Sequence, residues 1–215
     1  MNSGSLIAKT LLPAYFRLKG LPVVRLLKEY EQSQWWPRDR LQEQALERLG
    51  RVLRAAQQRS PFYAERFRAQ GSAPEDIRDL DDLAQLPVLE KQDLAALHKS
   101  VRRSGPQFER RTAGTSGLPS VVLASCQAQA AALAARYRCY GWYGLKLGDR
   151  EARFWGRPIQ RATVASELKR AVLNRVGFDY RHIGAEAAAD TYRRLVDKNV
   201  TYAYGYHVGR LFLAP

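Results

Sequence analysis

Residues 121–140, VVLASCQAQAAALAARYRCY, join a short apolar run to a long alanine-rich stretch, and this junction decides the fold class. The run 121–124 has the β-branched composition of a buried strand, and alanine favours helix more than any other residue. The same order of strand and helix recurs downstream. Strands separated by helices indicate an α/β fold with a doubly wound, mostly parallel sheet and right-handed crossovers. We expect helices at 127–140, 164–176 and 185–197, and further strands at 152–155, 178–183 and 200–204.

The part of the chain before this sheet is predicted to be helical. Apolar residues recur at steps of three and four over 39–58, which predicts one long amphipathic helix, and a shorter helix is expected over 63–69. Trp35 and Trp36 are expected to anchor the long helix, and Trp142 to lie in the core. The sequence therefore divides into three segments: a basic amphipathic helical segment at 1–34, a helical region at 35–107 and an α/β region at 108–215.

The charge is strongly basic and unevenly distributed. The chain has 35 basic and 21 acidic residues, a net charge of +14, and residues 111–215 hold 16 basic but only 7 acidic side chains. Such a field attracts phosphates, nucleic acid, anionic lipid or an acidic partner, or belongs to a face that an acidic domain covers. Nucleic acid is the less favoured partner, because the aromatic residues do not interleave with the basic cluster.

The sequence gives few indications of membrane binding or of a metal site. The apolar stretch 5–27 is interrupted by four cations, so we expect a terminal helix docked on its own domain, with peripheral contact with a membrane surface as the alternative. Cys126 and Cys139 form no disulfide framework, which predicts a reducing, cytoplasmic compartment. His98, His182 and His207 lie far apart, so no metal site is expected.

Residues 111–120, RTAGTSGLPS, carry the strongest chemical signal. Glycines let a backbone turn tightly and bring its N–H groups close to an anion, hydroxyl groups can donate to phosphate oxygens, and arginine keeps its charge. The loop is not a Walker A motif, since it lacks the lysine of that motif and no helix follows directly. On these residues alone, a plain turn and a phosphate-binding loop both remain open.

The loop resembles the Thr/Ser/Gly-rich phosphate-binding signature of adenylate-forming enzymes. Flanking segments in the same order resemble the phenylacetate–CoA ligase-like branch, including its capsular-polysaccharide-biosynthesis relatives. The resemblance covers roughly residues 35–215, and no single element of it is very specific. The flanking segments are Ser60-Pro61-Phe62-Tyr63, LPVLEKQDL at 86–94, Tyr140-Gly141-Trp142, Gly148-Asp149-Arg150, Phe154-Trp155-Gly156 and Tyr204-Gly205-Tyr206.

The resemblance implies an ATP-dependent ligase of the acyl-CoA synthetase superfamily. In that chemistry a small carboxylate attacks the α-phosphate of ATP, giving an acyl-adenylate and pyrophosphate, and a thiol such as CoA then takes the acyl group. The loop would hold the β- and γ-phosphates, with Mg²⁺ sharing their charge, and the α/β region would bind the nucleotide. The residues that match the signature are Thr112, Gly114, Thr115, Ser116 and Gly117, with Arg111 as an added charge. No catalytic residue is assigned.

The sequence also departs from the family pattern. Ser120 stands where a lysine is common, and the 215 residues contain no Tyr-Gly-x-Thr-Glu segment, no later ribose-binding aspartate motif and no lid with a catalytic lysine. We therefore expect an N-terminal portion of such an enzyme, inactive alone and completed by a missing C-terminal half or a complementary chain. The alternatives are a non-catalytic basic binding module for nucleic acid or a membrane surface, and a scaffold pseudoenzyme.

Overall fold

The computed structural model describes residues 3–90, 92–94, 97, 107–111, 121–154, 163–178 and 185–205. By their contacts the residues group into two compact units, one of residues 1–27 with 133–215 and one of residues 28–132. These units follow contacts, whereas the three segments expected from the sequence follow composition and element order; that division stays a prediction.

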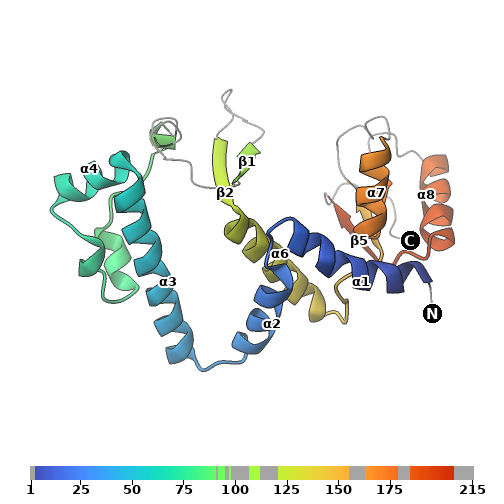
Figure 1. The fold of residues 1–215 in the computed structure, drawn as a ribbon, viewed down its shortest axis with the longest axis horizontal. Coiled ribbons are helices and arrows are strands. Elements are labelled where there is room, and N and C mark those ends of the chain that lie inside the picture. Colours follow the sequence, from blue (N-terminus) through green and yellow to red (C-terminus); the bar gives the residue numbers. More distant parts are fainter. Residues whose placement is uncertain are drawn as a thin grey trace. The chain divides into compact units, whose positions relative to one another are not determined.

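Helices dominate the unit of residues 28–132, as the hydrophobic spacing predicts (Figure 1). Helix α3 spans Arg38–Arg59, and Ser60-Pro61 ends it and begins α4, Pro61–Gln70. Gly71 ends α4 in the left-handed conformation, at a φ of 65°, where glycine has no steric penalty. Two short 3₁₀ helices follow, η1 at Pro74–Asp76 and η2 at Asp81–Gln85.

The core of this unit lies between α3 and α4. Leu53, Phe67 and Ile77 are buried together, and further apolar side chains from both helices and from the segment after η2 pack against them. The expectation that both tryptophans anchor α3 is only partly right. The Arg40 guanidinium lies 3.7 Å from the centre of the Trp36 ring, but Trp35 is 80% exposed.

A hairpin that the sequence did not predict closes this unit. Strand β1, Gln107–Arg111, pairs antiparallel with β2, Val121–Ser125, and α6, Cys126–Gly141, follows directly. The strand expected at 121–124 is therefore present, but it belongs to a separate two-stranded sheet and not to the parallel sheet. Because β1 has one apolar residue among five, hydrophobic patterning gave no sign of it.

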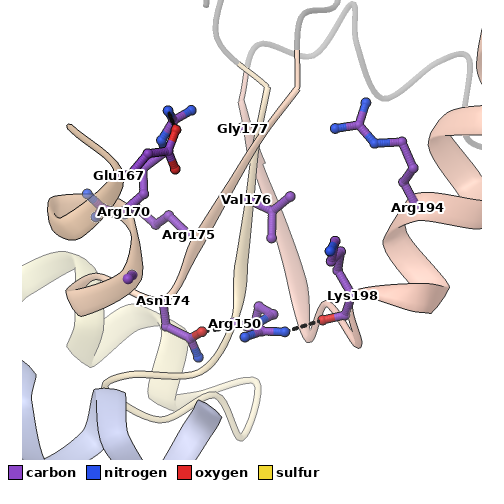
Figure 2. Close-up of a pocket in the computed structure, with 10 residues that line it drawn as sticks. Arg150, Glu167, Arg170, Asn174, Arg175, Val176, Gly177, Arg194 and Lys198 are labelled. Atoms are coloured by element: carbon purple, nitrogen blue, oxygen red, sulfur yellow. Dashed lines mark hydrogen bonds and ion pairs between the residues drawn. The ribbon is translucent and has the colours of Figure 1, made fainter. Parts of the chain in front are cut away.

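The unit of residues 1–27 and 133–215 contains a three-stranded parallel sheet with the order β4-β3-β5. The strands are β3, Glu151–Phe154, β4, Arg175–Phe178, and β5, Tyr202–Gly205. Helices α7, Val164–Val172, and α8, Ala185–Asp197, connect them and lie on opposite sides of the strands (Figure 2). The α/β class with a helical N-terminal region is thus confirmed, with a small parallel sheet.

The end of α7 and the start of β4 differ from expectation for the same local reason, the conformation of Asn174 between them. Asn174 and Asn199 both adopt a φ of 48°, the left-handed conformation that asparagine tolerates better than most residues. Asn174 lies between α7 and β4, so the helix expected to reach residue 176 ends at Val172 and the strand begins at Arg175 rather than at 178. The asparagine after the apolar pair Val172-Leu173 was the available signal.

The N-terminal segment forms α1, Ser3–Leu18, followed by α2, Val23–Ser33. Leu12 and Phe16 of α1 are buried, α1 contacts α7, and Lys9 Nζ lies 3.0 Å from Asp149 Oδ1. A Cβ at Gly148, whose φ is 90°, would come within 3.2 Å of the Lys9 backbone, so glycine is required at this approach. The helix is therefore docked on its own domain.

The expectation that Trp142 is a core residue is wrong, since its side chain is mostly exposed.

Candidate functional site

The two ends of the phosphate-loop candidate are held by the β1–β2 hairpin. Arg111, the last residue of β1, pairs with Val121, the first residue of β2. Paired residues of antiparallel strands lie about 4.5–5.5 Å apart, so the chain leaves and re-enters the hairpin at adjacent positions. The residues assigned to phosphate contact, Thr112, Gly114, Thr115, Ser116 and Gly117, lie outside the described residues, and only the backbone of Arg111 is described.

Side chains at the base of the hairpin tie it to helix α6. The Ser125 hydroxyl accepts a hydrogen bond from the Ala128 N–H at 3.1 Å, in the manner of a helix N-cap. The guanidinium of Arg110, the residue before Arg111, donates to the side-chain oxygen of Gln129. These contacts attach the hairpin, and with it the strand ends Arg111 and Val121, to a regular helix.

The carboxyl ends of the three parallel strands form the second place where a ligand is expected. Phe154, Phe178 and Gly205 are the last residues of β3, β4 and β5, and the two phenylalanine rings stack with centres 4.9 Å apart. A Cβ at Gly205 would overlap the backbone of Phe154, so only glycine fits beside this strand. The residues that follow each strand, including Trp155 and His207, lie outside the described residues, as do the other two histidines.

One face of this sheet carries a buried charge network that sequence reasoning missed. Glu151 is 1% exposed; its carboxylate accepts from Arg153 Nε at 2.7 Å and from the Tyr202 hydroxyl at 3.0 Å, and it forms an ion pair with Arg175 at 3.0 Å. Tyr204 lies in the same face, with the guanidinium groups of Arg136 and Arg153 5.1 and 5.4 Å from its ring centre. The alternation of Glu-x-Arg in β3 and Tyr-x-Tyr in β5 was the available signal.

The network holds charged side chains in place and does not supply a general base. Burial, and then the negative charge of Glu151, raise the pKa of Tyr202 far above its usual value, so this hydroxyl stays protonated as a donor. Burial also raises the pKa of Tyr140, which packs edge-on against the Tyr202 ring at 5.1 Å. Glu151 begins β3, at the end of the sheet opposite to the expected ligand side, so the network positions strands and does not touch a reacting group there.

Within the described residues, no group of three or more His, Cys, Asp or Glu side chains could hold a metal ion. The two cysteines form no disulfide and lie near opposite ends of α6. In the same part of the chain, no helix has the length and apolar character needed to cross a bilayer.

Comparisons with known proteins add family information. No family model matches the chain. Over 88 residues, the chain is 36% identical to the phenylacetate-coenzyme A ligase of Pseudomonas putida and 34% identical to that of Escherichia coli strain K12. Each match covers 39% of this chain and 20% of the relative, so the matched part spans about a fifth of the length of these curated proteins.

Solved structures match over more of the chain. The open conformation of a 2-hydroxyisobutyryl-CoA ligase, in complex with 2-HIB-AMP and CoA, matches with a TM-score of 0.56 and 20% identity over 80% of this chain and 39% of that chain. The same ligase in its postadenylation state gives a TM-score of 0.54, again at 20% identity, over 78% of this chain and 37% of that chain.

Together the comparisons give a distant, partial similarity to phenylacetate-CoA ligases and the fold of part of an adenylate-forming ligase. They give no support to the narrower resemblance to capsular-polysaccharide-biosynthesis relatives.

Proposed function

We propose that this chain supplies the polyphosphate-binding part of an ATP-dependent carboxylate-activating ligase. The observation that carries the proposal is the Gly- and hydroxyl-rich loop 112–120 between two paired strand ends, Arg111 and Val121. The distant similarity to phenylacetate-CoA ligases and the shared fold support the same reaction class.

In the proposed reaction, a carboxylate oxygen of the substrate attacks the α-phosphorus of ATP, and the bond to the bridging oxygen of the β-phosphate breaks. The products are an acyl-adenylate and pyrophosphate. A thiol, proposed to be that of CoA, then attacks the acyl carbon, forms a thioester and releases AMP. The thiol proton leaves to solvent or to a base.

The loop would act by positioning and by charge neutralisation. Its N–H groups and the hydroxyls of Thr112, Thr115 and Ser116 can donate to the β- and γ-phosphates, whose charge grows as pyrophosphate leaves. The residue types fit a polyphosphate: glycines allow close approach, and every hydroxyl is a donor. Mg²⁺ held by the nucleotide itself would neutralise part of the phosphate charge.

ATP binding tests this proposal directly. We expect the 215-residue chain to bind ATP with Mg²⁺ more tightly than AMP, and Thr115→Ala to weaken ATP binding about tenfold or more, because a hydrogen bond to a charged group contributes about 1.5–3 kcal/mol. AMP binding should change little, since AMP lacks the phosphates that the loop contacts. Isothermal titration with both nucleotides provides the measurement.

Thr201→Ala is the matched control, because it removes the same hydroxyl at an exposed position outside the loop. Equal ATP affinity of the Thr115→Ala variant and the unsubstituted chain would contradict the proposal. We also expect carboxylate-dependent exchange of pyrophosphate into ATP to be weak or absent for these 215 residues alone, because the sequence holds no Tyr-Gly-x-Thr-Glu segment.

A further inference from the structure

Strand β4 has an unpaired outer side in the part of the chain that is described. The sheet order is β4-β3-β5, and the Glu151 N–H donates to the Asn174 carbonyl oxygen at 3.0 Å. In a parallel pair, this bond fixes which residues face the neighbour: Val176 faces β3, whereas Arg175 and Gly177 direct their N–H and C=O groups outward. An outward row of backbone donors and acceptors is a template for another strand.

A groove of about 570 Å³ follows this outer side of β4, between α7 and α8 (Figure 2). Gly177 lines the groove, and a Cβ added there would meet nothing closer than an Arg170 nitrogen at 3.8 Å, so the groove is open above this residue. The ionisable side chains that line the groove are Arg150, Arg170, Arg175, Arg194, Lys198 and Glu167.

Three of the five cations have no carboxylate partner among the described residues. Arg170 pairs with Glu167, and Arg175 with the buried Glu151. By contrast, Arg150 donates to two neutral oxygens, Asn174 Oδ1 at 2.9 Å and the Lys198 carbonyl at 2.7 Å, and keeps its charge uncompensated. Arg194 lies over the Phe178 ring at 4.9 Å, and no acidic side chain is in contact with that residue or with Lys198 in the described chain.

The cations lie on both sides of the strand edge. Figure 2 shows Arg170 and Arg175 on the side of α7, and Arg194 and Lys198 on the side of α8. Successive side chains of an added strand point to opposite faces of a sheet. An extended segment with carboxylates on both of its faces would therefore meet cations on each side while its backbone bonds to Arg175 and Gly177.

We propose that the β4 edge binds an extended acidic polypeptide segment as an added strand. A second copy of this chain does not fit, because it would bring the same cationic edge against this one. The sequence of the undescribed stretches contains a single acidic residue, Asp179, and so offers few carboxylates to pair with these cations. The occupant is therefore an acidic segment outside these 215 residues, and this inference does not depend on the proposed nucleotide site.

The probe is a fluorescein-labelled decapeptide of Glu, Val and Thr, with carboxylates on both faces when extended. Fluorescence anisotropy at about 150 mM salt should detect saturable binding to the 215-residue chain. Arg194→Ala/Lys198→Ala should weaken it by about tenfold or more, equivalent to about 1.4 kcal/mol. Arg193→Ala is the matched control: this neighbour on α8 is 73% exposed, lies 3.8 Å from Asp190 and does not line the groove, so binding should change less than about twofold.

A second peptide keeps the test independent of any variant that fails to fold. Methylation of alternate backbone nitrogens leaves the peptide's charge intact but prevents it from pairing as a strand, so we expect it to bind at least about tenfold more weakly. Equal binding of the methylated peptide would overturn the proposal and indicate attraction by charge alone. Complete displacement by equimolar inorganic pyrophosphate would also overturn it, in favour of a small-anion site, as would an absence of peptide binding.

Discussion

The two faces of the three-stranded sheet are stabilised in opposite ways. On one face, Ala152, Phe154 and Phe178 are buried against apolar residues of β4, α8 and the turn before β5. On the other, Glu151 is equally buried but is surrounded by arginines and by the Tyr202 hydroxyl. Both faces come from the same three short strands, because successive side chains alternate.

The comparison teaches that burial has different consequences on the two faces. Apolar burial is non-directional, and its loss scales with the volume removed. A buried carboxylate costs free energy to desolvate and is stable only while its partners remain in place. The apolar face therefore supplies most of the stability of the sheet, and the charged face requires a particular strand alignment. Three substitutions probe this difference.

Phe154→Ala should have the largest effect. It removes a fully buried ring that stacks on Phe178, and a Phe→Ala change in a core costs about 3–5 kcal/mol. Hydrogen exchange of amides in β3 and β5 measures the local free energy of opening. Val164→Ala, at an exposed position on α7, should change it by less than about 0.5 kcal/mol. Similar losses for both variants would contradict the division into faces.

Glu151→Gln should have an intermediate effect. The amide keeps the shape of the side chain but removes the charge that faces Arg153 and Arg175, so we expect a loss of about 2 kcal/mol in the same exchange measurement. Glu167→Gln removes the same charge beside Arg170 at a side chain that is 56% exposed, and should cost about 0–1 kcal/mol. A larger loss for Glu167→Gln would refute the role assigned to burial.

Tyr202→Phe should have the smallest of the three effects, and its effect should appear only at alkaline pH. The pKa of Tyr202 is higher in the folded state than its unfolded value of about 10, so its stabilising contribution is complete below pH 10 and is lost as the pH rises above it. Tyr202→Phe should make this loss of unfolding free energy less steep, while the exposed Tyr143→Phe should leave it unaltered. Urea unfolding at several pH values from 8 to 11 measures it; equal slopes in all three proteins would contradict the prediction.

Local patterns predicted the helices well and the strand pairing poorly. Helix α3 and helix α8 begin and end within one residue of their expected positions, because the spacing of apolar residues and the Ser60-Pro61 boundary are local signals. Strand β1 and its antiparallel pairing with β2 were missed, although the strand at 121–124 was expected, because pairing depends on residues on both sides of the loop 112–120. The assignment of that loop to phosphate binding stays a prediction.

The sequence by itself determined the helical first half, the alternation of strands and helices after it, the excess of positive charge and the Gly- and hydroxyl-rich loop before the strand at 121–124. Each of these depends on residues close together in the chain. Only the tertiary structure decided that β2 leaves the parallel sheet, that Glu151 meets Arg175 and Tyr202, and that the outer side of β4 is flanked by cations. These features join residues distant in sequence, and such contacts arise from packing and register, which no local pattern specifies.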